Sequence, residues 1–278
     1  MDLAALIRTA TPKKNEVALF SLGQAGFLLK GGGGTIFVID PCLTDCGERL
    51  RGFKRLAPKL ISPFELEPDI YLTTHLHFDH FDYDAIPIIG ACRKTLFCGP
   101  GSCMNEFAKI GFAKDKTARL EAGMTLEHHG VRVTATYADH SDMAPDAVGA
   151  FVEMDGHRFY FTGDTAYHQD YFHQVAMLQP DVAVISINGE YGNMNAEESA
   201  RAAKDIGAGT VIPCHFWMFA EHQGNPLEFR RKLKNYAPGC RLLMLSQGEQ
   251  AVFCEVEGLK KILSEDDRRN LGRTGVTK

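Results

Sequence analysis

The stretch THLHFDHFD, residues 74–82, carries three histidines and two aspartates directly after a short apolar run. His75 and His77 are two positions apart, so they point the same way from a strand end or a tight loop but would diverge on a helix. Asp79 and His80 follow on the turn into the next segment and form a second pair. Desolvating so many titratable groups together is costly unless a metal or a counter-charge is present. The stretch therefore predicts a metal site at a strand end, with ligands that suit zinc, manganese or iron.

Four ligands from one loop do not complete two metal sites, so further ligands are expected from distant strand ends. The candidates are His140 in TYADHSD, Asp164 in FTGDT and His215 in IPCHFW. With them, seven side chains would hold two divalent ions, Zn2+ as the expected metal and Mn2+ as the alternative, because none of the ligands is a thiolate. Asp164, the carboxylate among the distant three, is expected to bridge the ions. Asp40 and Asp82 are expected to support the ligands from outside, Asp40 by accepting the second ring N–H of a ligand histidine.

A weak internal repeat places these residues at strand ends. In the first half, GTIFVID ends at Asp40 and DIYLTTH ends at His75; in the second half, GHRFYFTGD ends at Asp164 and GTVIPCH ends at His215. A duplicated β-rich unit, packed face to face with helices outside, would bring all four strand ends to one rim. Such carboxyl ends are where α/β proteins commonly collect functional groups. The predicted fold is an α/β, four-layer αββα sandwich with internal pseudo-duplication.

The chain is expected to form one domain over residues 1–278, with pseudo-symmetric halves at about 15–125 and 126–255 and a charged tail over 260–278. Residue composition and alternation predict strands at 17–20, 27–29, 35–39, 70–73, 131–136, 158–161 and 210–212. Helix-like patterns occupy about 84–90, 102–111, 168–178, 196–207 and 226–236. The fourth helix has an N-cap at Asn195 with Glu198 three positions later, as in a capping box.

The composition favours a small-molecule substrate. With 35 acidic and 30 basic residues, the formal charge is −5 and the pI about 6.1, so nothing global attracts nucleic acid or an anionic membrane surface. The N-terminal apolar run at residues 3–7 is too short for a signal peptide or a membrane span, and a cytoplasmic location is expected. The eight cysteines include no CxxC pair and are expected to be free thiols. Assembly into a homo-oligomer is compatible with a chain of this size.

On these motifs the sequence resembles the metallo-β-lactamase fold superfamily, whose signature is carried here by Asp40, HLHFDH at 75–80, His140, Asp164 and His215. The resemblance implies that His75, His77 and His140 hold one metal, that Asp79, His80 and His215 hold the other, and that Asp164 bridges them. Within the superfamily, FSLGQAGFLLK, PFELEPDIYLTTHLHFDHFD, LFCGPGSC, TGDTAYH and DVAVISINGEYGNMNAEESARAA are similar to the L-ascorbate-6-phosphate lactonase branch. That similarity runs from about residue 19 to 230.

The expected reaction is the opening of a lactone or ester of a small sugar acid, phosphorylated or not, by a hydroxide that bridges the metals. Asp79 is the expected catalytic residue, because it could orient the hydroxide or carry its proton to the leaving alkoxide. Phosphodiester cleavage is an alternative, since phospholipase D-like relatives share the motif with a following aspartate, here Asp82. A non-catalytic metal-binding protein is a third reading.

Four residues are candidates for substrate binding. Arg55 lies in the basic stretch ERLRGFKRLAPK, although a solvated basic face is the better explanation of that stretch because charge runs usually mean no more. Asn193 and Asn195 lie at a predicted helix start, whose free N–H groups suit an anion. Trp217 follows the ligand candidate His215 by two positions and is a candidate wall of the pocket, with core packing as the alternative.

Overall fold

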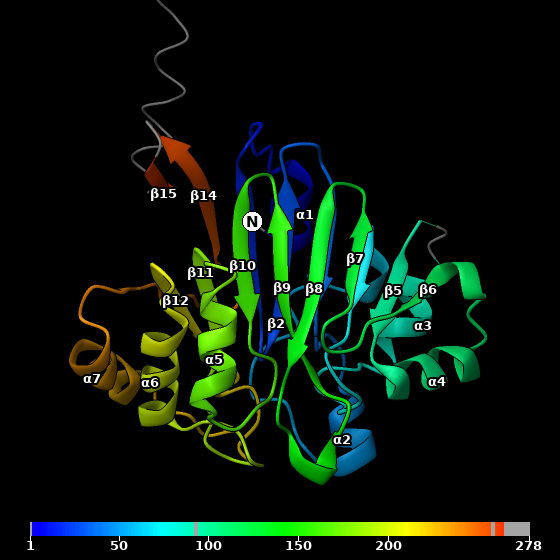
Figure 1. Ribbon diagram of the computed structural model, residues 1–278. Coiled ribbons are helices and arrows are strands. Elements are labelled where there is room, and N and C mark those ends of the chain that lie inside the picture. Colours follow the sequence, from blue (N-terminus) through cyan, green and yellow to red (C-terminus); the bar gives the residue numbers. More distant parts are fainter. Residues whose placement is uncertain (1, 92–93, 257–258, 264–278) are drawn as a thin grey trace, which may run out of the picture.

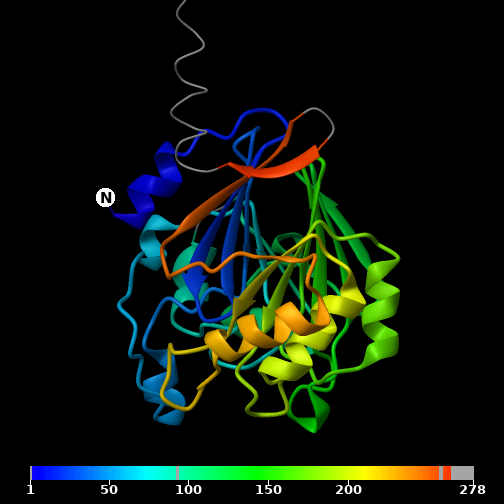
Figure 2. The same ribbon diagram turned by 90° about the vertical axis from the view of Figure 1, so that its left-hand side faces the viewer.

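The computed structural model describes residues 2–91, 94–256 and 259–263, and it confirms the expected α/β class. The described strands form two sheets that pack face to face, and helices cover the outer faces (Figure 1, Figure 2). This is the four-layer αββα sandwich. Among the described residues, no helix combines the length and the apolar character needed to cross a lipid bilayer.

Both sheets are mixed. The first contains, in spatial order, β15 (Leu259–Leu263), β14 (Gln250–Val256), β1 (Val17–Gly23), β2 (Gly26–Gly31), β3 (Ile36–Ile39), β4 (Ile70–Leu72), β5 (Leu96–Gly99) and β6 (Thr117–Arg119). The second contains β13 (Arg241–Leu242), β12 (Thr210–Cys214), β11 (Val182–Ser186), β10 (His157–Phe161), β9 (Val148–Met154), β8 (Val131–Tyr137) and β7 (Thr125–His128). Strands β3 to β6 are parallel, and so are β10 to β13; the other neighbours are antiparallel.

Helices lie on both outer faces. The first sheet is covered by α1 (Leu3–Thr9), α3 (Ala85–Gly90) and α4 (Gly101–Ile110), and the second by α5 (Gln169–Ala176), α6 (Ala196–Ile206) and α7 (Pro226–Tyr236). The short helix α2 (Cys46–Arg51) lies at one end of the sandwich (Figure 1). Single 3-10 turns lie at Pro63–Glu65, Lys114–Lys116 and Ser141–Met143. The predicted capping box is confirmed, because the Asn195 side chain accepts the N–H of Glu197 and Glu198 while Glu198 accepts the N–H of Asn195.

Alternation along the strands produces the layers, since successive side chains point to opposite faces of a sheet. In β1, Val17 and Leu19 face the core between the two sheets, whereas Phe20 faces the cluster under α1, α3 and α4. In β11, Val184 joins the central core and Ile185 packs with α5, α6 and α7. The sheets are thereby buried on both faces, which fixes the positions of the strand ends.

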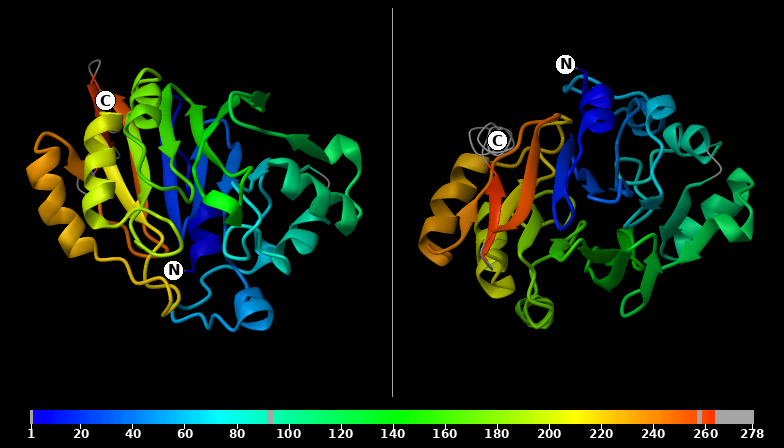
Figure 3. Two further views of the ribbon diagram at one scale, coloured as in Figure 1. Left: turned by 60° about the horizontal axis from the view of Figure 1, so that its bottom comes forward. Right: turned by 90° about the horizontal axis from the view of Figure 1, so that it is seen from above.

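The parallel strands deliver the predicted residues to one rim. Asp40 directly follows β3, and His75 lies in the loop after β4. Asp164 lies in the loop after β10, and His215 directly follows β12. The left view of Figure 3 brings this end of the sandwich forward.

Two expectations about the C-terminal part were wrong. Strand β14 returns to pair with β1, with Phe253 opposite Val17, so the end of the expected second half belongs to the first sheet. Lys260 lies in β15 and pairs with Glu255, because the hairpin with β14 continues the sheet where a tail from residue 260 was expected. Residues 264–278 of that expected tail lie outside the described part.

Candidate metal centre

Seven histidine and aspartate side chains converge at the rim. Their possible ligand atoms form overlapping groups within 4.8 Å, namely His75–His77–His140, His75–His80–Asp164 and Asp79–His80–His215. All are buried except His77, which is partly exposed. The structure thus brings together every ligand candidate taken from the sequence.

The first group consists of imidazole nitrogens. His75 and His77 come from the loop after β4, and His140 comes from the turn after β8. Nδ1 of His77 lies 3.0 Å from Nε2 of His75 and 3.2 Å from Nε2 of His140. Oδ2 of Asp164 lies 3.8 Å from Nε2 of His140 and adds a carboxylate oxygen to the group.

The second group combines two imidazoles with carboxylates. Nε2 of His215 lies 3.2 Å from both Nε2 of His80 and Oδ2 of Asp79. Oδ1 of Asp164 lies 3.3 Å from Nε2 of His80 and 3.2 Å from Nε2 of His215. Asp164 therefore presents Oδ2 to the first group and Oδ1 to the second.

These separations fit divalent ions. Metal–nitrogen bonds of about 2.0–2.1 Å in a tetrahedral site place neighbouring ligand atoms about 3.3–3.4 Å apart, and the distances here run from 3.0 to 3.8 Å. In addition, Oδ1 of Asp164 is buried and accepts no hydrogen bond from the described residues. The charge of such a buried oxygen must be balanced by a cation close by, either a bound metal or the protonated rings of His80 and His215, whose Nε2 atoms lie 3.3 and 3.2 Å away. The donor set therefore suits a metal that takes nitrogen and oxygen ligands.

Strong charge coupling marks the second group. Burial opposes the charged form of His215, but Asp164 and Asp79 outweigh it and raise its pKa to about 9. Burial also opposes the charged form of His80, but the nearby carboxylates, Asp164 and Asp40 first among them, outweigh burial and raise the pKa of His80 well above its ordinary value. Burial would raise the pKa of Asp79, yet His80 and His215 hold it well below its ordinary value. Without metal, this group is an ion-paired network that retains protons.

Neutral imidazoles mark the first group. Burial lowers the pKa of His140 to about 4 and lowers that of His75 well below its ordinary value, with neighbouring histidines adding to the effect. Burial also lowers the pKa of His77. Since only the neutral ring offers a lone pair, these three histidines are ready to ligate at neutral pH.

Asp40 lies where the sequence placed it, behind a ligand candidate. Its Oδ2 lies 2.8 Å from Nδ1 of His80, and its carboxylate accepts hydrogen bonds from the backbone N–H and the hydroxyl of Thr74 at 2.7 and 2.6 Å. A proton on Nδ1 of His80 leaves the Nε2 lone pair facing the second group. Asp40 has a positive φ of 45°, which is uncommon outside glycine and common at functional sites.

Asp82 has a different role from the one expected. Its carboxylate accepts hydrogen bonds from the backbone N–H groups of Leu43, Thr44, Asp84 and Ala85 and from the Thr44 hydroxyl. These partners belong to the loop after β3 and to the start of α3. Asp82 therefore ties that loop to the helix and contacts none of the ligand candidates through these bonds.

The expected anion-binding groups are already engaged. The Arg55 side chain is 5% exposed, and its Nη2 donates to the backbone carbonyls of Cys42, at 2.5 Å, and Thr44, at 3.1 Å. Its Nε and Nη1 are buried and have no hydrogen-bond partner among the described residues, although Nε lies 3.7 Å from Oδ1 of Asp45. Asn195 fills the start of α6 with its own side chain, which satisfies the N–H groups that an anion would use. Asn193 is buried and donates to Oδ2 of Asp164 at 2.8 Å, so it supports a ligand candidate.

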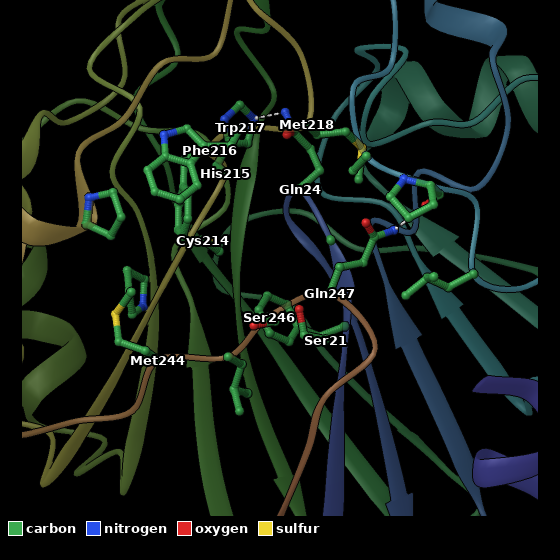
Figure 4. Close-up of a pocket in the computed structure, with 18 of the residues that line it drawn as sticks. Ser21, Gln24, Cys214, His215, Phe216, Trp217, Met218, Met244, Ser246 and Gln247 are labelled. Atoms are coloured by element: carbon green, nitrogen blue, oxygen red, sulfur yellow. Dashed lines mark hydrogen bonds between the residues drawn. The ribbon is translucent and has the colours of Figure 1, made fainter. Parts of the chain in front are cut away.

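Trp217 does line a pocket. The indole is 59% exposed, and it borders a cavity of about 650 Å³ together with Gln24, His215 and Met244. Most of the lining is apolar. In Figure 4 the side chains of Gln24 and His215 meet at one end of this cavity, where Nε2 of each lies 3.3 Å from the other. The cavity is therefore adjacent to the second group.

Two residues of the centre were missed from the sequence. Nε2 of Gln24, in the turn between β1 and β2, lies 2.9 Å from Oδ2 of Asp79 and contacts Nδ1 of His222. His222 is buried, and its ring stacks on that of His215 with 4.7 Å between centroids. A polar Gln24 inside the apolar stretch FSLGQAGFLLK was a usable signal. His222 lies in an irregular loop, where sequence alone offered none.

Comparison with known proteins agrees with this geometry. A model of the Beta-lactamase superfamily domain matches residues 36–216. A UPF0173 metal-dependent hydrolase of Methanoculleus marisnigri is 32% identical over 238 residues, covering 82% of this chain and 93% of that protein. Another from Nitratidesulfovibrio vulgaris strain DP4 is 34% identical over 186 residues, covering 66% of this chain and 77% of that protein.

Solved structures share the fold. Igni18, a metallo hydrolase from Ignicoccus hospitalis, superposes with a TM-score of 0.69 at 24% identity, covering 87% of this chain and all (100%) of that one. The metallo-β-lactamase fold protein YhfI from Bacillus subtilis gives a TM-score of 0.65 at 18% identity, covering 85% and 99%. The match to the family model and to the hydrolases, together with the ligand geometry, shows that the chain belongs to the metallo-β-lactamase superfamily and is a metal-dependent hydrolase.

Proposed function

We propose that this hydrolase opens a lactone or ester of a small sugar acid, using two divalent ions held by the seven ligand candidates. Zinc is the first choice for these ligands, and manganese is the alternative. The observation that supports two ions is the position of Asp164, which offers Oδ2 to the group around His140 and Oδ1 to the group around His215. Such ions, when bound, polarise a carbonyl oxygen and lower the pKa of water towards 7.

The protein's own groups have separate tasks in this proposal. His75, His77 and His140 would hold one ion, Asp79, His80 and His215 would hold the other, and Asp164 would contact both. Asp79 is a buried anion whose pKa lies well below its ordinary value despite burial, because His80 and His215 lie beside it. It is therefore ionised and can accept a hydrogen bond from the attacking water, whose proton goes to the leaving alkoxide.

The surroundings favour a substrate without a phosphate group. The Arg55 side chain is only 5% exposed, with Nη2 bonded to backbone carbonyls and Nε 3.7 Å from Oδ1 of Asp45, so the guanidinium is not open to a phosphate. The start of α6 is closed by Asn195. The cavity beside His215 is within the size range of small-molecule pockets and mostly apolar. An uncharged acyl group is therefore a better match than a phosphorylated one.

The test compares three substrates on the metal-loaded protein: an unphosphorylated sugar lactone, its phosphorylated counterpart and an activated phosphodiester. We expect the unphosphorylated lactone to give the highest kcat/KM. A phosphodiester rate far above both lactone rates would overturn the proposal in favour of a phosphodiesterase.

A further inference from the structure

Gln24 connects His222 to the second ligand group. Its side-chain Nε2 lies 2.9 Å from Oδ2 of Asp79 and beside Nδ1 of His222. Its backbone oxygen accepts the N–H of His215 at 2.9 Å. Asp79 is a carboxylate that can only accept, so the atom of Gln24 facing it must be the donating nitrogen. With the amide reversed, Oε1 of Gln24 would face Oδ2 of Asp79, and both of these atoms are acceptors.

This orientation determines where His222 carries its proton. The amide NH2 of Gln24 can only donate, so Nδ1 of His222 must accept with its lone pair. In the neutral ring the single proton then lies on Nε2. The polar contacts of the His222 ring in the described part of the chain, with Gln24 and Asp79, are both at Nδ1. The Nε2–H group is thus left for another partner.

The ring of His222 is packed against the second ligand group. It stacks on His215 and meets the rings of Phe53, Tyr191 and Phe219 edge to face at centroid distances of 5.5 to 5.7 Å. The His222 side chain is 5% exposed, whereas Tyr191 beside it is 45% exposed. The backbone also fixes the loop, because His222 O accepts the N–H of Trp217 at 3.0 Å. Aromatic contacts on several sides leave the ring little freedom to turn.

We propose that His222 is a further catalytic residue, whose Nε2–H donates a hydrogen bond to the carbonyl oxygen of the substrate, and that Gln24 is the positioning residue that fixes its tautomer. This inference rests on the proposed ester or lactone hydrolysis. The bond from the attacking oxygen to the carbonyl carbon forms, the bond to the alkoxy oxygen breaks, and the proton of the attacking water goes to the alkoxide. His222 keeps its proton, and its hydrogen bond strengthens as the carbonyl oxygen becomes negative.

The kinetic test uses His222→Phe, which keeps an aromatic ring and removes the donor, and His222→Gln, whose amide N–H can reach the position of Nε2. Removal of one such donor typically costs about 10²–10³ in kcat. We expect that loss in His222→Phe with the metal content of the wild type, and partial recovery in His222→Gln. The matched control is His173→Phe, which should keep the wild-type rate. His173 lies on α5, and its side chain is 54% exposed.

A second measurement does not depend on turnover. Nitrogen-15 NMR of the zinc-loaded protein reports which ring nitrogen of His222 carries the proton. We expect the proton on Nε2 in the wild type and a mixture of tautomers in Gln24→Met, which has similar size and no N–H donor.

The outcomes separate the two proposals. A metal-loaded wild type that hydrolyses no lactone or ester overturns the proposed function. An active wild type whose His222→Phe variant keeps its kcat, or loses metal in step with activity, overturns the role of His222 alone. A proton on Nδ1 of His222 in the wild type overturns it as well.

Discussion

Oδ2 of Asp40 lies 2.8 Å from Nδ1 of His80, and both side chains are almost completely buried. The contact joins the end of β3 to the loop after β4, so the parallel pairing of these strands positions the support of a ligand. The Asp40 carboxylate also accepts hydrogen bonds from the backbone N–H and from the hydroxyl of Thr74. Its position is therefore fixed by both a backbone group and a side-chain group.

Asp40→Asn replaces one acceptor oxygen by an NH2 group and removes the charge that faces His80. Loss of such an outer partner typically weakens metal binding about 10- to 100-fold. We expect a loss of that size in competition with a chromophoric chelator, with an unchanged circular dichroism spectrum. Asp115→Asn, at an exposed turn, is the control that should leave affinity unchanged. Equal affinities for Asp40→Asn and the wild type would contradict the role of Asp40.

Metal removal should make stability depend on pH. In the metal-free protein the pKa of His215 is raised from 6.5 to about 9, so the folded state binds a proton more tightly than the unfolded state. That contribution to stability is fully present below pH 6.5 and is lost as the pH rises through 9. We expect the Tm of the chelated protein to fall across this interval and that of the metal-loaded protein to change little. If the Tm of the chelated protein and that of the metal-loaded protein changed with pH in the same way, the raised pKa of His215 in the metal-free protein would be contradicted.

Metal uptake should release protons at pH 8. His215 holds a proton there in the metal-free state, because its pKa is raised to about 9, and the pKa of the neighbouring His80 is raised as well. A ligating imidazole must be neutral. Calorimetric titrations with zinc in two buffers of different ionisation enthalpy measure the number released. Identical heats in both buffers would show that the second group was already deprotonated.

Asp82→Ala should destabilise the fold and leave metal binding intact. Several buried N–H and O–H groups would lose their acceptor, which we expect to cost about 2–4 kcal/mol in the free energy of unfolding measured with urea. Asp84→Ala, which breaks an exposed ion pair with Arg49, is the neighbouring control and should cost less than about 1 kcal/mol. Weaker metal binding by Asp82→Ala at unchanged stability would restore the role expected from the sequence.

Much of the centre was predictable because its residues lie at ends of periodic strands. Asp40, His75, Asp164 and His215 each follow an apolar run, and parallel pairing brings such ends together. His77 and His80 were predictable because they lie within five positions of His75 in the sequence. By contrast, the contacts of Asp82 and Arg55 depend on the path of the loop after β3, which has no periodicity to read.

Two of the strands that the sequence did not predict, β11 and β14, have a physical explanation. β11, VAVIS, is buried along its whole length, so it shows no alternation of apolar and polar residues. β14 pairs with β1 across more than 200 positions of sequence, and nothing local indicates that partner. His222 was missed for the same reason, since its contact with Gln24 joins residues 198 positions apart.

The most direct test of the dinuclear hydrolase is a metal titration followed by both mass spectrometry of bound metal and lactone hydrolysis. We expect activity to vanish with a chelator, to return with added zinc and to reach its plateau at two ions per chain, while His77→Ala loses metal and activity together. Full turnover of a lactone by protein that retains no divalent metal would contradict the central claim.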